Sequence, residues 1–221
     1  KGGHGVGALT IMPSRPFDND CRKQPEMTRQ KTEKHHAKHR NRVRIIGGSC
    51  RGRQLVFTDA AGLRPTADSV RERLFNWLGQ DLSGLAVLDL FAGSGALGFE
   101  AASRNAQSVC LCEIQAQTAA TLQRQAQEFG LQDRLQVVRQ DALSFLQQSR
   151  LKFDVVFLDP PFGWAKWPEL FKALENRLAD QAAVYIEAEA LPPLPPYLEV
   201  RREGRAGKSV FALARQPEIG N

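Results

Sequence analysis

The sequence predicts an α/β fold with a mostly parallel sheet and a C-terminal antiparallel hairpin. After Gly84, short apolar segments alternate with longer segments of helical periodicity, the pattern of a parallel sheet covered by helices on both faces. Near the C-terminus, two apolar segments flank Gly204 and Gly207 without an intervening helix, which predicts a hairpin. A basic segment with a glycine-rich turn precedes this domain and predicts a small N-terminal appendage.

Residues 1–42 are predicted to form a disordered basic arm. The first part of it is rich in Gly, Pro and Asn without apolar periodicity, and Met27, which opens a basic segment, is the more natural first residue. From Arg29 to Arg53, nine Lys or Arg residues stand against one acid, Glu33. Such a segment binds phosphates without reading base sequence, and the alternative for its first half is a solvated charged tail.

Residues 43–80 are predicted to form a hairpin followed by a helix. Apolar residues from Val43 to Phe57 flank a glycine-rich turn, which predicts the hairpin. Asp68 can cap the helix, whose broad apolar face leaves Arg71 and Arg73 on the polar side.

Residues 81–215 are predicted to form the main domain, with residues 216–221 as a tail. The predicted strands are Ala86–Leu90, Ser108–Glu113, Leu135–Arg139, Asp154–Asp159 and Ala183–Ala188. The predicted helices are Ala96–Arg104, Gln115–Phe129, Ala142–Gln148 and Pro168–Leu178. The C-terminal hairpin is predicted from Leu198–Arg202 and Ser209–Ala214.

The composition indicates a protein that meets a polyanion. The net charge is +6 and the pI is near 9.4. No apolar run approaches a membrane span and no signal-peptide pattern is present, so a soluble cytoplasmic protein is expected. We also expect it to act as a monomer. The four cysteines are expected to be reduced, because Cys110 and Cys112 are spaced too tightly for a zinc knuckle, and no metal site is predicted.

A glycine turn follows the first predicted strand, in Asp89-Leu90-Phe91-Ala92-Gly93-Ser94-Gly95. With Gly98 it also satisfies the dinucleotide fingerprint, and Glu113 lies where a ribose-binding acid belongs, so the turn alone fits NAD or S-adenosylmethionine. Asp89 favours the second, since a carboxylate near the turn suits an ammonium and is unwelcome beside a pyrophosphate. Asp141, at the third strand's end, can accept a hydrogen bond from an adenine amino group.

A second motif, Asp159-Pro160-Pro161-Phe162, closes an apolar run 66 residues beyond Gly93. The amine of a nucleobase is a weak nucleophile because its lone pair is delocalised into the ring. Two acceptors, the Asp159 carboxylate and the Pro160 carbonyl, would favour a pyramidal nitrogen, while Phe162 can stack on an extruded base. The alternative for the tetrapeptide by itself is an ordinary Pro-Pro turn.

Together with Arg64-Pro65-Thr66 and the segment Val70–Leu78, these motifs resemble the bacterial 16S ribosomal RNA guanine-N2 methyltransferase family, over most of residues 43–215. The resemblance implies a class I, Rossmann-like, S-adenosylmethionine-dependent fold. It implies methylation of guanine 966 in the 16S ribosomal RNA of the small subunit or its late precursor. The segment from Gly47 to Arg53 is also similar to that family's basic hairpin. The residues predicted to bind RNA are Arg44, Arg51, Arg53, Arg71 and Arg73.

The resemblance also implies roles for the site residues. Asp89 and the amides around the glycine turn would meet the donor's methionine end, Glu113 its ribose and Asp141 its adenine. The residues predicted to bind the donor are Arg64, Thr66, Asp89, Phe91, Gly93, Gly95, Glu113, Asp141 and Ala142. The predicted catalytic residues are Asp159, Pro160 and Phe162. Asp159 or water can then take the amine's proton without a raised carboxylate pKa, and no metal or covalent nucleophile is required.

Three alternatives remain open. An adenine-N6 methyltransferase acting on DNA or RNA would use the same motif, although the chain has little room for a domain that reads DNA sequence. An NAD-dependent oxidoreductase would leave Asp159 to Phe162 unused. A non-catalytic RNA-binding assembly factor could keep the fold. Trp164 and Trp167 are either core or stacking residues.

Overall fold

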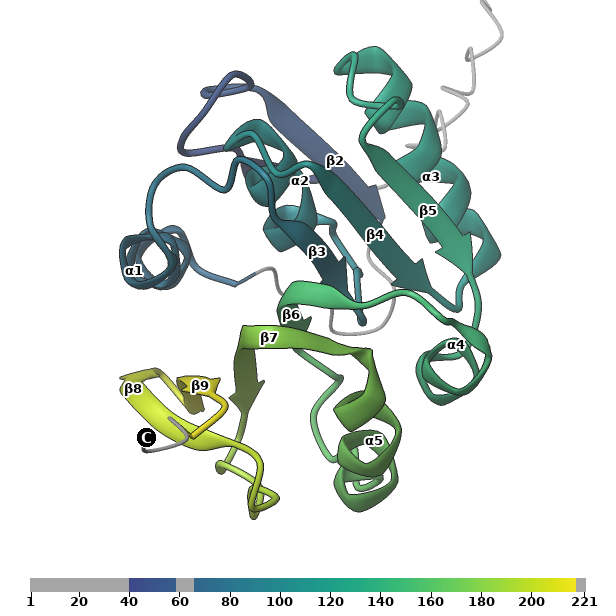
Figure 1. The fold of residues 1–221 in the computed structure, drawn as a ribbon. Helices are drawn as coiled ribbons and strands as arrows, with labels where there is room; N and C mark the ends of the chain where they lie inside the picture. The colour runs from purple at the N-terminus through teal and green to yellow at the C-terminus, as the bar shows by residue number, and fades with distance from the viewer. Residues whose placement is uncertain (1–39, 59–65, 218–221) are drawn as a thin grey trace, which may run out of the picture. The chain divides into compact units, whose positions relative to one another are not determined.

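The computed structural model describes residues 40–58 and 66–217, all within one compact unit (Figure 1). The predicted arm therefore lies outside the described residues except for its last three. These belong to a strand, β1 (Arg40–Arg44), which begins three residues before the predicted start of the hairpin. No helix among these ranges is both long enough and apolar enough to cross a membrane.

The central sheet has seven strands in the order β5-β4-β3-β6-β7-β9-β8. The first five in this order run parallel, and β9 pairs antiparallel with both β7 and β8. Their bounds are β3 (Ala86–Asp89), β4 (Ser108–Glu113), β5 (Leu135–Arg139), β6 (Phe153–Leu158), β7 (Leu178–Ala188), β8 (Glu199–Ala206) and β9 (Ser209–Arg215). This topology confirms the predicted α/β fold and places a switch point between β3 and β6, where ligands of open α/β sheets collect.

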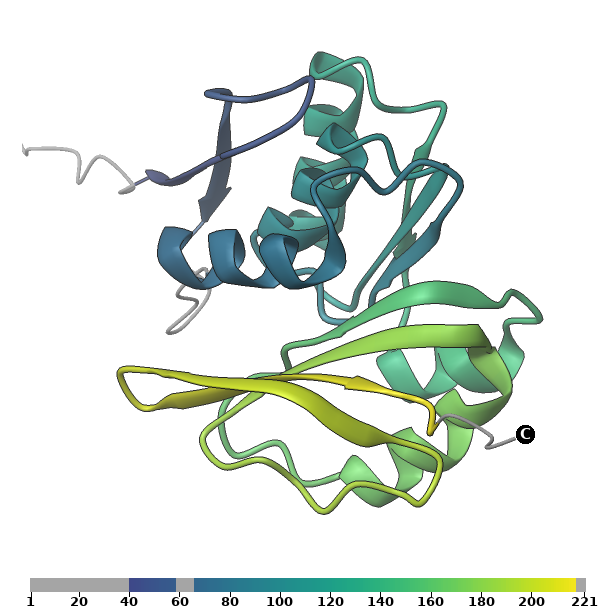
Figure 2. The same ribbon diagram turned by 60° about the vertical axis from the view of Figure 1, so that its left-hand side comes forward.

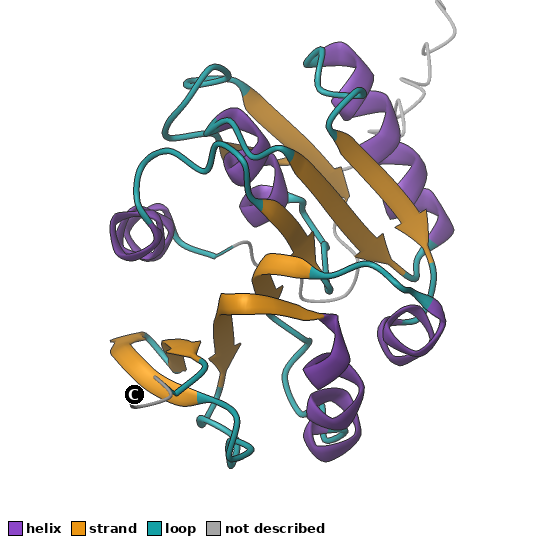
Figure 3. Ribbon diagram, in the orientation of Figure 1, coloured by secondary structure: helices purple, strands orange, loops and turns teal. Residues whose placement is uncertain are grey.

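Helices cover both faces of the sheet (Figures 2 and 3). One buried cluster joins the sheet to α1 (Asp68–Leu78), α2 (Ala96–Ser103) and α3 (Ala116–Glu128). A second cluster lies on the other face, with α4 (Ala142–Gln148) and α5 (Trp167–Leu174). The sheet residues alternate between the clusters, since Val87 belongs to the first and Leu88 to the second.

Some predicted boundaries differ from the observed ones. The last predicted helix ends at Leu174, is followed by the 3-10 turn Glu175–Arg177, and β7 starts at Leu178, five residues before its predicted start. The first residues of β7 do not show a regular apolar pattern, because the backbone at Gln181 has a φ of 61° and the register with β6 shifts there. The predicted cap Asp68 is instead the first helical residue after the N-cap Ala67.

The N-terminal hairpin pairs β1 with β2 (Gln54–Thr58) and docks on α2. The backbone N–H groups of Ile46 and Gly47 donate to the Glu100 carboxylate at 2.9 and 2.7 Å. Gly48 has a φ of 73°, and a Cβ there would lie 1.8 Å from the Ser103 carbonyl oxygen. The hairpin turn therefore needs glycine and is held against one face of α2.

Candidate functional site

Acidic side chains line the carboxyl edge of the sheet on the face that carries α1, α2 and α3. Asp89, the last residue of β3, is level with Leu111 of β4 and Phe157 of β6. Glu113 and Asp159 each lie two residues beyond these partners, so their side chains share the same face. The sheet therefore brings the glycine-turn strand and the Asp-Pro-Pro-Phe strand together, as neighbours at the switch point.

The glycine turn links β3 to α2 and is fastened by Glu113. Gly95 is the N-cap of α2 with a φ of 77°, and a Cβ there would lie 2.6 Å from Leu122 Cδ2. Glu113 accepts from the Gly93 N–H at 3.0 Å through Oε2 and from the Gln115 N–H at 2.7 Å through Oε1. The carboxylate predicted to meet a ribose thus also fixes the turn against the end of β4.

Asp89 is buried beneath this turn, with 2% of its surface exposed. Its Oδ2 accepts from the Gly98 N–H at 3.0 Å, so it serves the first turn of α2 in the manner of a capping acid. Burial raises the pKa of Asp89 to about 7, and the Glu113 charge raises it slightly further. Hydrogen bonds from the backbone of Gly98 and Phe91 act in the opposite direction and lower it. An adjacent cation would favour the ionised form.

Asp141 and Ala142 begin α4 at the end of the next strand. Asp141 is the N-cap, and its Oδ1 accepts from the Ser144 N–H at 3.0 Å. Its side chain is exposed, while Ala142 is buried. Phe91 is partly buried against Trp164, with ring centroids 5.3 Å apart. The structure places these residues at the carboxyl edge, and their contact with a nucleoside remains a prediction.

Asp159 follows β6 directly and is engaged from the segment before α1. The buried Thr66 donates from its hydroxyl to Asp159 Oδ2 at 3.3 Å, while Arg64 lies outside the described residues. Burial raises the pKa of Asp159 well above its usual range, and the carboxylates of Glu187 and Asp89 add to the shift. A raised pKa was not expected to be necessary for this residue, yet the site provides one.

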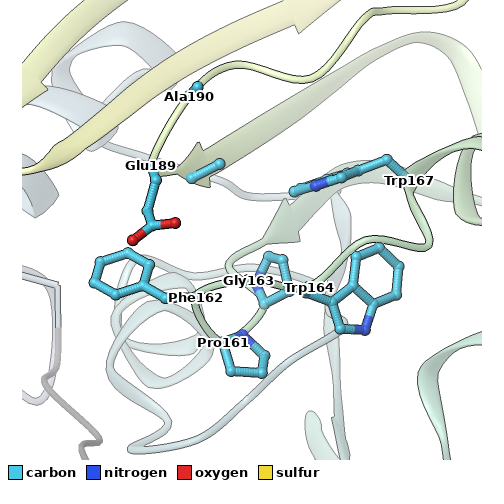
Figure 4. Close-up of a pocket in the computed structure, with 9 residues that line it drawn as sticks. Pro161, Phe162, Gly163, Trp164, Trp167, Glu189 and Ala190 are labelled. Atoms are coloured by element: carbon cyan, nitrogen blue, oxygen red, sulfur yellow. The ribbon is translucent and has the colours of Figure 1, made fainter.

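Phe162 stands beside a hollow of about 240 Å³ (Figure 4). Its side chain is 62% exposed, whereas Pro160 is buried. Trp164 and Trp167 pack edge to face at 5.4 Å and also contact the apolar cluster of α4 and α5. The hollow is lined by Pro160, Pro161, Phe162, Gly163, Trp164, Trp167, Ala188, Glu189 and Ala190. The two tryptophans thus serve both the core and the walls of a surface hollow beside the motif.

Two polar residues of β7 were missed by the sequence reasoning. Tyr185 is fully buried, and its hydroxyl donates to Glu187 Oε2 at 2.8 Å. Glu187 lies near the end of a predicted strand, which is the same signal that identified Glu113. The rule that strand-end acids mark a ligand edge would therefore have found it.

The predicted RNA-binding arginines divide into two groups. Arg44 is exposed and lies 3.7 Å from Asp68, and Arg51 is exposed on the hairpin turn. Arg53 donates to the Glu128 carbonyl at 2.6 Å with its guanidinium 3.8 Å from the centre of the Phe129 ring. Arg73 is exposed over Phe211 at 5.6 Å. All four are exposed, and their binding to RNA phosphates remains a prediction.

The prediction for Arg71 is wrong. Its side chain is fully buried and pairs with Glu100 at 3.3 Å and Asp68 at 2.6 Å, while donating to the Arg44 carbonyl. Arg104 also pairs with Glu100, at 2.8 Å. Arg71 therefore holds α1, α2 and the hairpin together, and a guanidinium without solvent contact cannot bind RNA.

Known proteins match the part of the chain that was predicted to fold. A family model described as Conserved hypothetical protein 95 matches residues 43–215. The sequence is 40% identical over 183 residues to the ribosomal RNA small subunit methyltransferase D of Escherichia coli K12, covering 80% of this chain and 92% of that protein. It is 43% identical over 157 residues to the protein of the same name from Haemophilus influenzae, covering 69% of this chain and 81% of that protein.

Solved structures show the same fold. The structure of yhhF from Escherichia coli superposes with a TM-score of 0.72 at 40% identity, covering 80% of this chain and 98% of that one. The Thermus thermophilus 16S rRNA N2 G1207 methyltransferase, solved with AdoMet and guanosine, has a TM-score of 0.60 at 22% identity, covering 80% of this chain and 50% of that one. At this identity, the match to the Thermus thermophilus structure shows a shared fold and nothing beyond it.

Proposed function

This chain belongs to the family described as Conserved hypothetical protein 95, and on that basis we propose that it methylates the N2 amine of a guanine in 16S ribosomal RNA. The methyl donor is S-adenosylmethionine, and the target is guanine 966 of the small subunit or its late precursor. The observation that carries the proposal is the adjacency of Asp89, the last residue of β3, and Asp159, which directly follows the neighbouring strand β6. This adjacency joins a donor-binding half and an amine-binding half.

The charge of the site suits this donor. The chain carries a net charge of +6, yet its carboxyl edge gathers the carboxylates of Asp89, Glu113 and Asp159 on one face. S-adenosylmethionine carries an ammonium and a sulfonium, and like-charged carboxylates in a partly buried site favour such a ligand. When bound, it supplies an electrophilic methyl group whose bond to sulfur breaks as the amine nitrogen forms a bond to carbon.

The chain's own residues act on the amine. The Asp159 carboxylate accepts one N–H and the Pro160 carbonyl the other, which localises the nitrogen lone pair and stabilises the positive charge that develops. The raised pKa of Asp159 then makes its carboxylate a better acceptor for the proton that the methylated nitrogen loses. Phe162, being exposed, stacks on the extruded base and fixes its plane.

The exposed arginines provide the RNA contacts. Arg44, Arg51 and Arg53 on the hairpin and Arg73 on α1 bind phosphates and position the small subunit, while the shape of the RNA supplies selectivity. We expect the protein to act as a monomer in the cytoplasm, where small subunits mature.

The testing experiment transfers labelled methyl from S-adenosylmethionine to small subunits from cells that lack the enzyme, followed by digestion to nucleosides. N2-methylguanosine is the expected product, and Asp159→Ala is the matched inactive control. N6-methyladenosine would move the target to adenine. Bound donor without label would contradict catalysis and favour an RNA-binding assembly factor.

A further inference from the structure

A second carboxylate stands beside Asp159 on the next strand. Phe157 of β6 is paired with Tyr185 of β7, and Leu158 with Ile186, so Glu187 is level with Asp159 one residue further on. The Phe157 and Tyr185 rings meet edge to face at 6.3 Å on the α1 side. Because side chains alternate along a strand, Asp159 and Glu187 project from that same side at the carboxyl edge.

Glu187 is held in place rather than free to rotate. The Tyr185 hydroxyl, buried beneath it, donates to Oε2 at 2.8 Å. Burial raises the pKa of Tyr185 well above its usual range, and the nearby Glu187 charge raises it further, so the phenol stays protonated and can donate. The other oxygen, Oε1, is engaged by none of the described residues, and the side chain is partly exposed.

We propose that Glu187 accepts the N1–H of the target guanine and thereby selects guanine over adenine. The inference rests on the proposed function, since it concerns the base whose N2 amine meets Asp159. Guanine presents two adjacent donors on its Watson–Crick edge, N1–H and the N2 amine, which two neighbouring carboxylates can accept together. Adenine presents its amine beside a bare N1 lone pair, and an ionised carboxylate only accepts hydrogen bonds. Glu187 would thus be left unpaired and repelled by adenine.

The base 2,6-diaminopurine tests this directly, because it keeps the 2-amino group but has no N1–H. Small subunits are reassembled with ribosomal RNA that carries either guanine or 2,6-diaminopurine at the target position. We expect the wild-type kcat/KM to favour guanine by about tenfold to a hundredfold, the loss associated with an unpaired charged acceptor. In Glu187→Ala, guanine methylation should slow and this preference should fall to within about threefold.

Two matched variants separate recognition from structure. Glu203→Gln, exposed on β8, should keep the wild-type preference. Tyr185→Phe keeps the ring but frees Glu187, and should reduce the preference partway even if Glu187→Ala fails to fold. Glu187→Ala and Tyr185→Phe each remove the hydrogen bond of the buried Tyr185 hydroxyl, so a lower Tm is expected in both, whereas the Kd for S-adenosylmethionine should be unchanged in each variant that folds.

A preference that persists in Glu187→Ala or Tyr185→Phe, or a wild-type enzyme indifferent to 2,6-diaminopurine, overturns the assignment of Glu187. These results would leave the proposed function intact. Wild-type protein that forms no N2-methylguanosine on guanine-containing subunits would overturn the proposed function itself and this inference with it.

Discussion

The affinity for S-adenosylmethionine should weaken as the pH falls, because its ammonium is expected to meet Asp89. The pKa of Asp89 is about 7 in the unliganded protein, so about half of the molecules carry a proton there at pH 7. A cation favours the ionised carboxylate, so binding releases that proton. If only the ionised form binds, lowering the pH from about 7 to about 5.5 raises the Kd roughly fifteenfold.

Isothermal titration calorimetry in two buffers of different ionisation enthalpy measures both the Kd and the number of protons released on binding. Binding should release about half a proton near pH 7 and about one near pH 5.5, below the range in which the donor's own amino group titrates. S-adenosylhomocysteine keeps the ammonium but lacks the sulfonium, so it isolates the Asp89 contribution.

Asp89→Asn is the matched variant, because its amide oxygen can still accept from the Gly98 N–H. It should bind the donor weakly at neutral pH and with a flatter pH dependence. A wild-type Kd that is constant over this interval, with no proton release, would refute the placement of the ammonium beside Asp89.

Four further outcomes are expected. Asp159→Ala should abolish turnover while the Kd for S-adenosylmethionine in calorimetry changes by less than about threefold, and equal loss of both would contradict its role at the amine. The unliganded protein should lose stability as the pH rises from about 4 to about 7, because folding raises the pKa of Asp89 and Asp159 and the folded state therefore binds protons more tightly; a Tm that rises over this interval would reverse the sign. Glu100→Gln should cost about 3–5 kcal/mol of unfolding free energy in urea titration, since it leaves the buried Arg104 without its carboxylate partner and Arg71 with Asp68 alone; a loss below about 1 kcal/mol would show that these guanidinium groups find other partners. Arg51→Ala should weaken binding of small subunits and reduce the slope of log Kd against log salt by about one, and an unchanged slope would remove it from the RNA interface.

The sequence predicted the parts of the fold that repeat a local pattern. Apolar segments identified the strands, and the acids at the strand ends predict a ligand edge, because parallel strands bring those ends together. Arg71 was placed wrongly because periodicity describes a single helix, whereas its partner Glu100 lies on another helix, 29 residues away. The early part of β7 was missed for a related reason, since its irregular register with β6 forms only in the assembled sheet.

The docking of the hairpin through Glu100 determines how this protein can be re-engineered. Helix α2 begins at the glycine turn, and its Glu100 and Ser103 hold the hairpin backbone at Ile46 to Cys50. If residues 40–58 were grafted onto another methyltransferase sheet, these backbone N–H groups would lose their hydrogen-bond acceptors, unless the recipient's first helix carries the same acid and hydroxyl. A working chimera must therefore carry the hairpin and α2 together, and α2 brings with it part of the glycine turn at its N-terminus.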